Sequence, residues 1–212
     1  SSNVEETILE LLDIKQEMFR RLKLVKDADV TGIVSYNSKV NKKDRLPFIF
    51  VIIDELFSFM TLPASPPNRK DATSEDLIFN QKTAYRTMAE IASMCRAVGI
   101  HLMFCTQRPT DSVIPTNITC NCGLRIGLRT SNEQESRNII EEKGLEIIDI
   151  NAVGQGIVKT DKLTRFQTFW TTEEKIREVC AKNKRTTLEA KVINKEKADE
   201  KAKSQIFDAF AE

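Results

Sequence analysis

Apolar residues along the chain follow helical spacing in some segments and form short continuous runs in others. Residues 4–26 place apolar side chains mostly three or four positions apart, which predicts an amphipathic helix. Residues 47–53 are apolar, β-branched or aromatic, and acidic residues follow them. This run predicts a strand buried on both faces of a parallel sheet. Residues 100–105 and 122–128 predict two further buried strands of the same kind.

Helical spacing returns between and after these runs. We expect helices over residues 77–98, 131–142 and 172–183, and short strands over 156–160 and 165–170. Strands that alternate with helices are typical of an α/β domain with a largely parallel sheet.

Two stretches differ from this alternation. Residues 61–76 contain prolines and mixed charges and predict an exposed loop. In the segment 181–212, basic residues outnumber acidic ones over its first two thirds, so we expect a charged helix or linker there. A solvated charged face is the favoured interpretation of this tail over a dedicated DNA-binding arm.

Composition excludes several classes of protein. The chain has 212 residues, 41% of them hydrophobic and 30% charged, which fits a soluble domain with one sizeable core. The formal net charge of +1 gives no overall basic bias toward nucleic acid. Five cysteines with irregular spacing and a single histidine, His101, argue against both a disulfide framework and a metal-ligand cluster.

Glycine is scarce, and this bears on nucleotide binding. The chain has 7 glycines, whereas an average composition would give about 15. They form no G-x-G-x-x-G pattern, and no glycine precedes Lys-Ser or Lys-Thr. A complete phosphate-binding loop is therefore absent from this sequence.

An acidic pair follows the first buried run. Asp54 and Glu55 would lie at the carboxyl end of a parallel strand, where open α/β sheets bind ligands. Asp54 can hold Mg²⁺, and Glu55 can orient or deprotonate a water that attacks a γ-phosphate. This is the Walker B arrangement of nucleoside triphosphatases. The alternative is an acidic pair in the turn after an ordinary core strand.

Polar residues also follow the second run. Gln107 lies just beyond residues 100–105 and can sense a γ-phosphate or position water, although turn chemistry before Pro109 is an alternative. Motor ATPases place an arginine of one subunit against the phosphates of its neighbour. The candidates for this role are Arg96, Arg125, Arg129 and Arg137.

Taken in order, these segments resemble the motor domain of the FtsK/SpoIIIE family of hexameric DNA-pumping ATPases. The matching segments are Met18–Leu24, Ile33–Asn37, Phe50–Leu56, Cys95–Leu102, Thr106–Pro109, Arg125–Ile126, Ser136–Arg137 and Gly154–Gly156. Each is weak alone, but the ordered set covers residues 15–180.

The resemblance implies roles for individual residues. Asp54 looks like the Walker B magnesium acid and Glu55 like the water-activating acid, while Gln107 looks like the family's polar sensor. Arg96 matches the arginine finger that acts between subunits. Arg125 and Arg137 match recurrent family arginines; their role stays open, and we count them with Arg96 and Asp54 as candidate nucleotide-binding residues.

The resemblance also implies a fold. We expect a RecA-like P-loop NTPase core with a largely parallel sheet, incomplete because the Walker A strand, loop and helix are absent. Residues 1–180 would form this partial motor domain, with 61–76 as an inserted loop and 181–212 as the charged tail. Such a fragment should bind ATP poorly and fail to turn it over.

The implied function is an ATP-driven ring, a hexamer, that translocates double-stranded DNA in chromosome segregation or conjugative transfer. It would use ATP and Mg²⁺ at subunit interfaces, on the cytoplasmic face of the cell membrane, with membrane contact through amino-terminal segments outside this chain. Two segments depart from the family pattern: the loop at 61–76 and the sequence of residues 144–154. One alternative is therefore a type VII secretion ATPase that moves protein substrates, and another is a degenerate, non-catalytic motor domain that serves as a scaffold.

Overall fold

The computed structural model describes residues 4–65 and 73–183, which form two compact units, the first ending at Cys122 and the second beginning at Gly123. The central part of the predicted inserted loop, residues 66–72, and most of the predicted charged tail, residues 184–212, lie outside the described residues. The helices of the first unit are α1 (Val4–Asp27), α2 (Ile33–Lys39), α3 (Ser74–Ile78), α4 (Gln81–Met94) and α5 (Thr116–Thr119). Its 3₁₀ turns are η1 (Lys42–Asp44), η2 (Leu56–Thr61) and η3 (Cys95–Val98), and its strands are β1 (Ile49–Ile53) and β2 (Ile100–Phe104).

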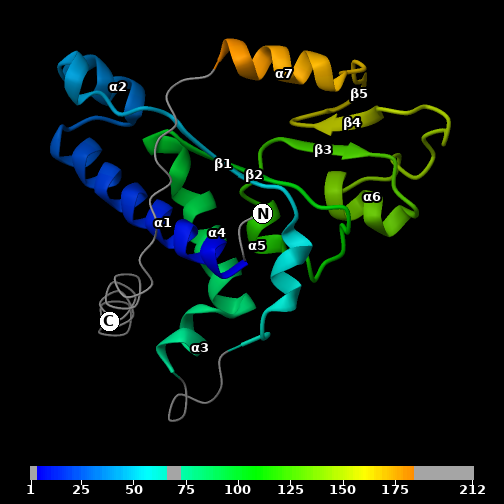
Figure 1. Ribbon diagram of the computed structural model, residues 1–212, viewed down its shortest axis with the longest axis horizontal. Helices are drawn as coiled ribbons and strands as arrows, with labels where there is room; N and C mark the ends of the chain where they lie inside the picture. The colour runs from blue at the N-terminus through cyan, green and yellow to red at the C-terminus, as the bar shows by residue number, and fades with distance from the viewer. Residues whose placement is uncertain (1–3, 66–72, 184–212) are drawn as a thin grey trace. The chain divides into compact units, whose positions relative to one another are not determined.

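The core of the first unit lies between a pair of strands and two long helices. β1 and β2 pair in parallel, from Ile49 opposite Ile100 to Ile53 opposite Phe104. Helices α1 and α4 lie side by side and pack into the same core as these strands (Figure 1). The predicted helix over residues 4–26 and the first two predicted strands are therefore confirmed.

The prediction that these strands are buried on both faces is wrong. Ile53 is 6% exposed on the helix-covered face, whereas Phe50 and Ile52 on the other face of β1 are 71% and 65% exposed. On β2, Met103 is likewise 53% exposed. A continuous apolar run predicts burial from composition alone, but the described residues supply helices to only one face of the pair.

The single helix predicted over residues 77–98 is divided into α3, α4 and η3. The division between α3 and α4 occurs at Asn80, which is fully buried. Its Oδ1 accepts a hydrogen bond from the Thr83 N–H, and its Nδ2 donates to the carbonyl oxygens of Asp76 and Leu77. One side chain thus ends α3 and begins α4, because asparagine bonds to backbone groups that a continuous helix would pair with each other.

The second unit is built on an antiparallel sheet. Its strands β3 (Arg125–Leu128), β4 (Gln155–Lys159) and β5 (Leu163–Gln167) pair in the order β3-β4-β5, and its helices are α6 (Glu133–Ile140) and α7 (Glu173–Lys182). The prediction of a buried parallel strand at 122–128 is wrong, since β3 pairs antiparallel with β4 and exposes Ile126 and Leu128 to solvent. Alternating burial of this kind is typical of antiparallel sheets with one covered face.

Candidate functional site

The predicted acidic pair lies where β1 ends. Asp54 follows the last residue of the strand and is exposed, and its carboxylate makes no hydrogen bond or ion pair with the described residues. Glu55 is half-buried and caps η2, because its side chain accepts a hydrogen bond from the Phe57 N–H. The two neighbouring carboxylates therefore differ: one faces solvent and the other is fixed.

Glu55 connects the ends of the two parallel strands. Its Oε1 accepts hydrogen bonds from the Thr106 hydroxyl at 2.6 Å and from the Phe57 N–H at 2.9 Å. Its Oε2 accepts one from the Gln107 N–H at 3.1 Å. A carboxylate has about four acceptor positions. These contacts leave it one for a further donor, such as a water molecule.

Two opposing effects act on the Glu55 carboxyl group. Burial raises its pKa, but hydrogen bonds from Thr106, Phe57 and Gln107, together with the positive charge of Arg108, outweigh burial and lower the pKa below its ordinary value. Glu55 is therefore ionised at neutral pH, as a group that accepts a proton or orients water must be.

Gln107 and Arg108 complete this end of the sheet. The backbone N–H of Gln107 is fixed on Glu55, while its side chain is exposed. The guanidinium of Arg108 lies over the ring of Phe57, 4.1 Å from the ring centre. The structure thus brings Asp54, Glu55 and Gln107 to one edge of the sheet, as parallel pairing of the strands requires.

This edge fits Mg²⁺ only as part of a larger ligand set. No group of three or more His, Cys, Asp or Glu side chains able to hold a metal occurs in the described part of the chain. Mg²⁺ in nucleotide sites is commonly held by one or two carboxylates together with phosphate oxygens and water. The exposed Asp54 carboxylate fits that limited role.

Arg96 lies at the opposite end of the strand pair. It belongs to η3, just before β2, whose length of about 13 Å separates it from the Gln107 end. Cys95 and Val98 of η3 are buried, whereas Arg96 is exposed and makes no ion pair within the described residues. A 3₁₀ helix has three residues per turn, so burial of residues 95 and 98 directs Arg96 outward.

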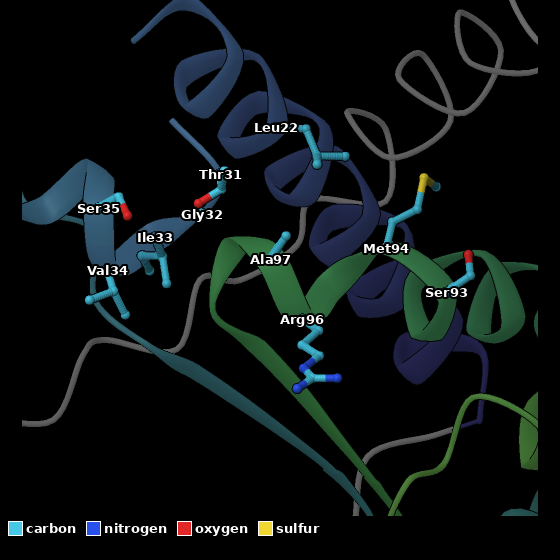
Figure 2. A pocket seen from close by; sticks show the side chains of 10 residues that line it. All are labelled: Leu22, Thr31, Gly32, Ile33, Val34, Ser35, Ser93, Met94, Arg96 and Ala97. Atoms are coloured by element: carbon cyan, nitrogen blue, oxygen red, sulfur yellow. The ribbon is translucent and has the colours of Figure 1, made fainter. Parts of the chain in front are cut away.

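A shallow hollow of about 600 Å³ lies beside Arg96. Arg96 is one of the residues that line it, and Figure 2 shows its side chain extending from η3 away from Leu22 and Met94. These residues are Leu22, Thr31, Gly32, Ile33, Val34, Ser35, Ser93, Met94, Arg96 and Ala97. Apart from Arg96 they are apolar or small and uncharged.

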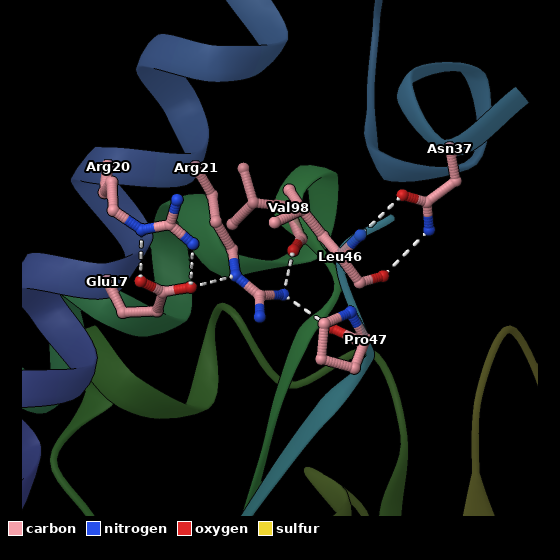
Figure 3. Close-up of polar contacts among 7 residues, drawn as sticks. All are labelled: Glu17, Arg20, Arg21, Asn37, Leu46, Pro47 and Val98. Carbon is pink, nitrogen blue, oxygen red and sulfur yellow. Dashed lines mark hydrogen bonds and ion pairs between the residues drawn. The ribbon is translucent and has the colours of Figure 1, made fainter. Parts of the chain in front are cut away.

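A second arginine near η3 is buried. Arg21 of α1 is 2% exposed and donates to Glu17 Oε1 and to the carbonyl oxygens of Pro47 and Val98 (Figure 3). Glu17 also pairs with Arg20. The pKa of Glu17 is lowered to about 2. The hydrogen bond from Arg20 has the largest effect, and with the smaller effects of Arg21 it outweighs burial, which raises the pKa.

The other three candidate arginines belong to the second unit. Arg129 donates a hydrogen bond to the carbonyl oxygen of Ile148 at 3.1 Å, and Arg125 and Arg137 form ion pairs. Arg125 of β3 forms an ion pair with Glu141 at 2.9 Å, and Lys159 bonds to the same carboxylate. Arg137 of α6 donates to Glu133. To bind a phosphate, Arg125 and Arg137 must each exchange a carboxylate partner for it, and their nucleotide-binding role stays a prediction.

Sequence reasoning missed the parts played by Thr106 and Arg21. Both lie inside the segments that carry the family resemblance, but nothing in the spacing indicates that the Thr106 hydroxyl binds Glu55. For Arg21, the available signal was its position on the apolar face of α1, close to Met18 and Val25 in helical spacing. From helical spacing alone, such an arginine is usually assigned to the border between the apolar and the polar face of the helix.

No family model matches the chain. Individual curated proteins do. The chain is 37% identical over 169 residues to a protein named DNA translocase FtsK from Caldanaerobacter subterraneus. The matched region covers 77% of this chain and 21% of the relative. The chain is 34% identical to the protein of that name from Treponema pallidum, over 61% of this chain and 15% of the relative. The chain thus spans about a fifth or less of the length of these relatives.

Solved structures share its fold. The pCW3 conjugation coupling protein TcpA, solved with ATPgS, superposes with a TM-score of 0.68 at 23% identity, over 85% of this chain and 49% of that one. The cytoplasmic domain of the Type VII Secretion ATPase EccC from Thermomonospora curvata superposes with a TM-score of 0.60 at 18% identity, over 83% of this chain and 20% of that one. The predicted α/β class, with an incomplete P-loop ATPase core, is confirmed by these likenesses.

Proposed function

Because the chain belongs to the FtsK/SpoIIIE family of motor ATPases, we propose that it is part of a ring-shaped motor that uses ATP to translocate double-stranded DNA. The observation that carries this proposal is the position of Glu55, whose ionised carboxylate follows β1 and is fixed by residues that follow the neighbouring parallel strand. In α/β sheets, the carboxyl ends of parallel strands are where ligands bind.

Each residue at this edge has a role in the proposed reaction. Glu55 orients the attacking water and accepts its proton, because it is ionised and keeps one free acceptor position. Thr106 and the Gln107 N–H hold Glu55 in place, and the exposed Gln107 side chain responds to the γ-phosphate. Asp54 holds Mg²⁺ directly or through water; the metal neutralises charge that develops on the phosphates.

Arg96 is proposed to act on the nucleotide of a neighbouring subunit. It lies at the end of β2 away from Glu55 and Gln107, so it is poorly placed for the site of its own subunit. Its guanidinium is exposed and makes no ion pair within residues 4–65 and 73–183, unlike those of Arg125 and Arg137. An unpaired guanidinium meets a phosphate without first giving up a carboxylate.

The named relatives favour DNA as the cargo. The similar sequences carry the name DNA translocase, at up to 37% identity. The likeness to the secretion ATPase EccC is at 18% identity and concerns the fold. Protein cargo is therefore the second candidate, and a non-catalytic scaffold is the third.

The complete protein tests this proposal. We expect duplex DNA of random sequence to stimulate its MgATP hydrolysis, with an affinity that falls steeply as salt rises, because phosphate contacts release counterions. The Glu55→Gln variant should bind the same DNA and ATP, with turnover lowered by about 10²- to 10⁴-fold. Absence of DNA binding, with hydrolysis stimulated by a protein substrate instead, would contradict the DNA proposal. Absence of any hydrolysis by the complete protein would favour the scaffold.

A further inference from the structure

We propose that Arg21 is a positioning residue that fixes η3 and thereby directs Arg96 toward the neighbouring subunit's nucleotide. This inference rests on the proposed function of Arg96. It goes beyond it by assigning a buried side chain of α1 to the geometry of a site that it does not touch.

Burial of Arg21 needs an explanation, because removing a guanidinium from water is costly unless it is paired and hydrogen-bonded. Its side chain is 2% exposed, and its Nε donates to Glu17 Oε1 at 2.7 Å. Its Nη1 donates to the carbonyl oxygens of Pro47 at 2.7 Å and of Val98 at 3.1 Å. A rigid, planar fork of donors can meet these three acceptors together, and a lysine ammonium cannot reproduce that arrangement.

The two carbonyl groups lie at equivalent places in the two strands. Ile49 and Ile100 are the first paired residues of β1 and β2, and Pro47 and Val98 precede them by two residues each. Arg21 therefore bridges the two chain segments just before the sheet begins (Figure 3). The segment before β1 is fixed from its other side as well, because Asn37 exchanges two hydrogen bonds of 2.8 Å with the backbone of Leu46.

The bridge acts on the turn that carries Arg96. Val98 is the last residue of η3, two positions after Arg96, and η3 has no side-chain cap of its own. Packing holds Cys95 and Val98, but a hydrogen bond to the Val98 carbonyl also fixes the rotation of that peptide. Since Arg96 projects from the opposite side of the same turn, a change in this rotation moves its guanidinium.

Arg20 provides a matched control on the same helix. It binds the same Glu17 carboxylate through two hydrogen bonds of 2.6 and 2.7 Å, yet its side chain is 54% exposed. The Arg20 side chain donates to Glu17, whereas the carbonyl groups of Pro47 and Val98 accept from Arg21. Arg20→Ala thus removes an arginine from the cluster while leaving the bridge to η3 in place.

The test is a double-mutant cycle in the complete, assembled protein with MgATP. We expect R21K to lower kcat about tenfold while the KM for ATP changes less than about twofold, because a small displacement of a transition-state group affects the chemical step. The double variant R21K/R96A should have the kcat of R96A alone. R20A should keep the kcat of the unchanged protein. Should R21K fail to assemble, E17A, which removes the side chain that accepts from Nε but keeps the guanidinium, takes its place in the same cycle.

The outcomes separate this inference from the proposal beneath it. If R96A impairs turnover and R21K lowers kcat by the same factor with or without Arg96, Arg21 acts independently and the inference is wrong. An unchanged kcat in R21K also overturns it. If R96A itself leaves kcat intact, the proposed role of Arg96 fails, and with it the reason for positioning that residue.

Discussion

Each end of the β1–β2 pair has one fixed and one exposed charged side chain, but these pairs are acidic at the carboxyl end and basic at the amino end. At the carboxyl end, half-buried Glu55 is fixed by hydrogen bonds from Thr106 and two backbone N–H groups, and Asp54 beside it is exposed. At the amino end, buried Arg21 is fixed by Glu17 and two carbonyl groups, and Arg96 nearby is exposed. Each end thus combines a fixed charge with an exposed one.

The exposed charges of Asp54 and Arg96 differ in sign, and the sign determines which ligands each end can bind. The carboxyl end presents the exposed Asp54 carboxylate together with the Arg108 guanidinium, which suits a metal–phosphate complex. The amino end presents the exposed Arg96 guanidinium, which suits phosphate alone. A single subunit separates these groups by the length of β2. In the proposed ring, two neighbouring subunits would bring opposite ends together on one nucleotide.

Loss of Arg96 should have the largest effect. Arg96→Ala should lower kcat of the assembled protein by about 10³-fold or more, the size expected for an arginine that stabilises charge on transferring phosphate. ATPase rates of the assembled and dissociated protein check this. Arg86→Ala, at an exposed arginine of α4, is the control and should keep full activity. An equal loss in dissociated subunits would show that Arg96 serves its own subunit.

Loss of the fixed carboxylate should come next. Glu55→Gln should lower kcat by about 10²- to 10⁴-fold, because the amide cannot accept a proton, while ATP binding measured by calorimetry stays near normal. Glu75→Gln, an exposed position on α3, serves as the control. Near-normal turnover by Glu55→Gln would show that Glu55 does not accept the proton of the attacking water.

The strand that joins the two ends should be stabilised on one face only. Ile53→Ala should reduce the free energy of unfolding by about 2–4 kcal/mol, because Ile53 is 6% exposed, and its neighbour Ile52→Ala by less than about 1 kcal/mol, because Ile52 is 65% exposed. Urea denaturation of the 212-residue chain measures both. Equal losses would mean that the second face is also covered in solution.

A smaller effect concerns the amino end and pH. The pKa of Glu17 is about 2, below the ordinary 4.5, so its ionised form is stabilised in the folded chain. Its contribution is complete above pH 4.5 and is lost as pH falls toward 2. We expect Glu17→Gln to cost about 1 kcal/mol at neutral pH, after allowance for solvent screening, and the difference from the unchanged chain to shrink in acid.

Thermal unfolding from pH 7 to pH 2.5 measures this dependence. Glu10→Gln, an exposed glutamate of the same helix, should leave the pH profile unchanged. A Glu17→Gln variant whose deficit stays constant down to pH 2.5 would contradict the ion-paired state of Glu17.

Sequence patterns predicted the first unit better than the second. Helical spacing predicted α1 almost to its ends, and the apolar runs predicted β1 and β2. Because parallel strands share a carboxyl edge, the meeting of Glu55 with Gln107 followed from the sequence as well. By contrast, the run at 122–128 looked equally buried, yet β3 pairs antiparallel with β4, and that choice depends on a partner strand some 30 residues later.

Two further features depended on contacts distant in sequence. Burial of Arg21 results from carbonyl groups 26 and 77 residues away, which no local pattern reveals. The break at Asn80 depends on a buried amide that caps one helix and ends another, although helical spacing continues through it. Helical periodicity indicates which face of a helix is apolar, but it does not indicate which hydrogen-bond partners a polar side chain on that face finds.

In the proposed ring, the two ends of the strand pair serve nucleotide sites in different subunits. This arrangement can be tested by mixing two impaired variants of the complete protein, Glu55→Gln and Arg96→Ala. Within a mixed ring, an Arg96→Ala subunit keeps its own Glu55 and can receive Arg96 from a Glu55→Gln neighbour. We expect ATP turnover to reappear on mixing and to depend on the ratio of the two variants. Mixtures that stay as inactive as the separate variants, although the rings assemble, would contradict it.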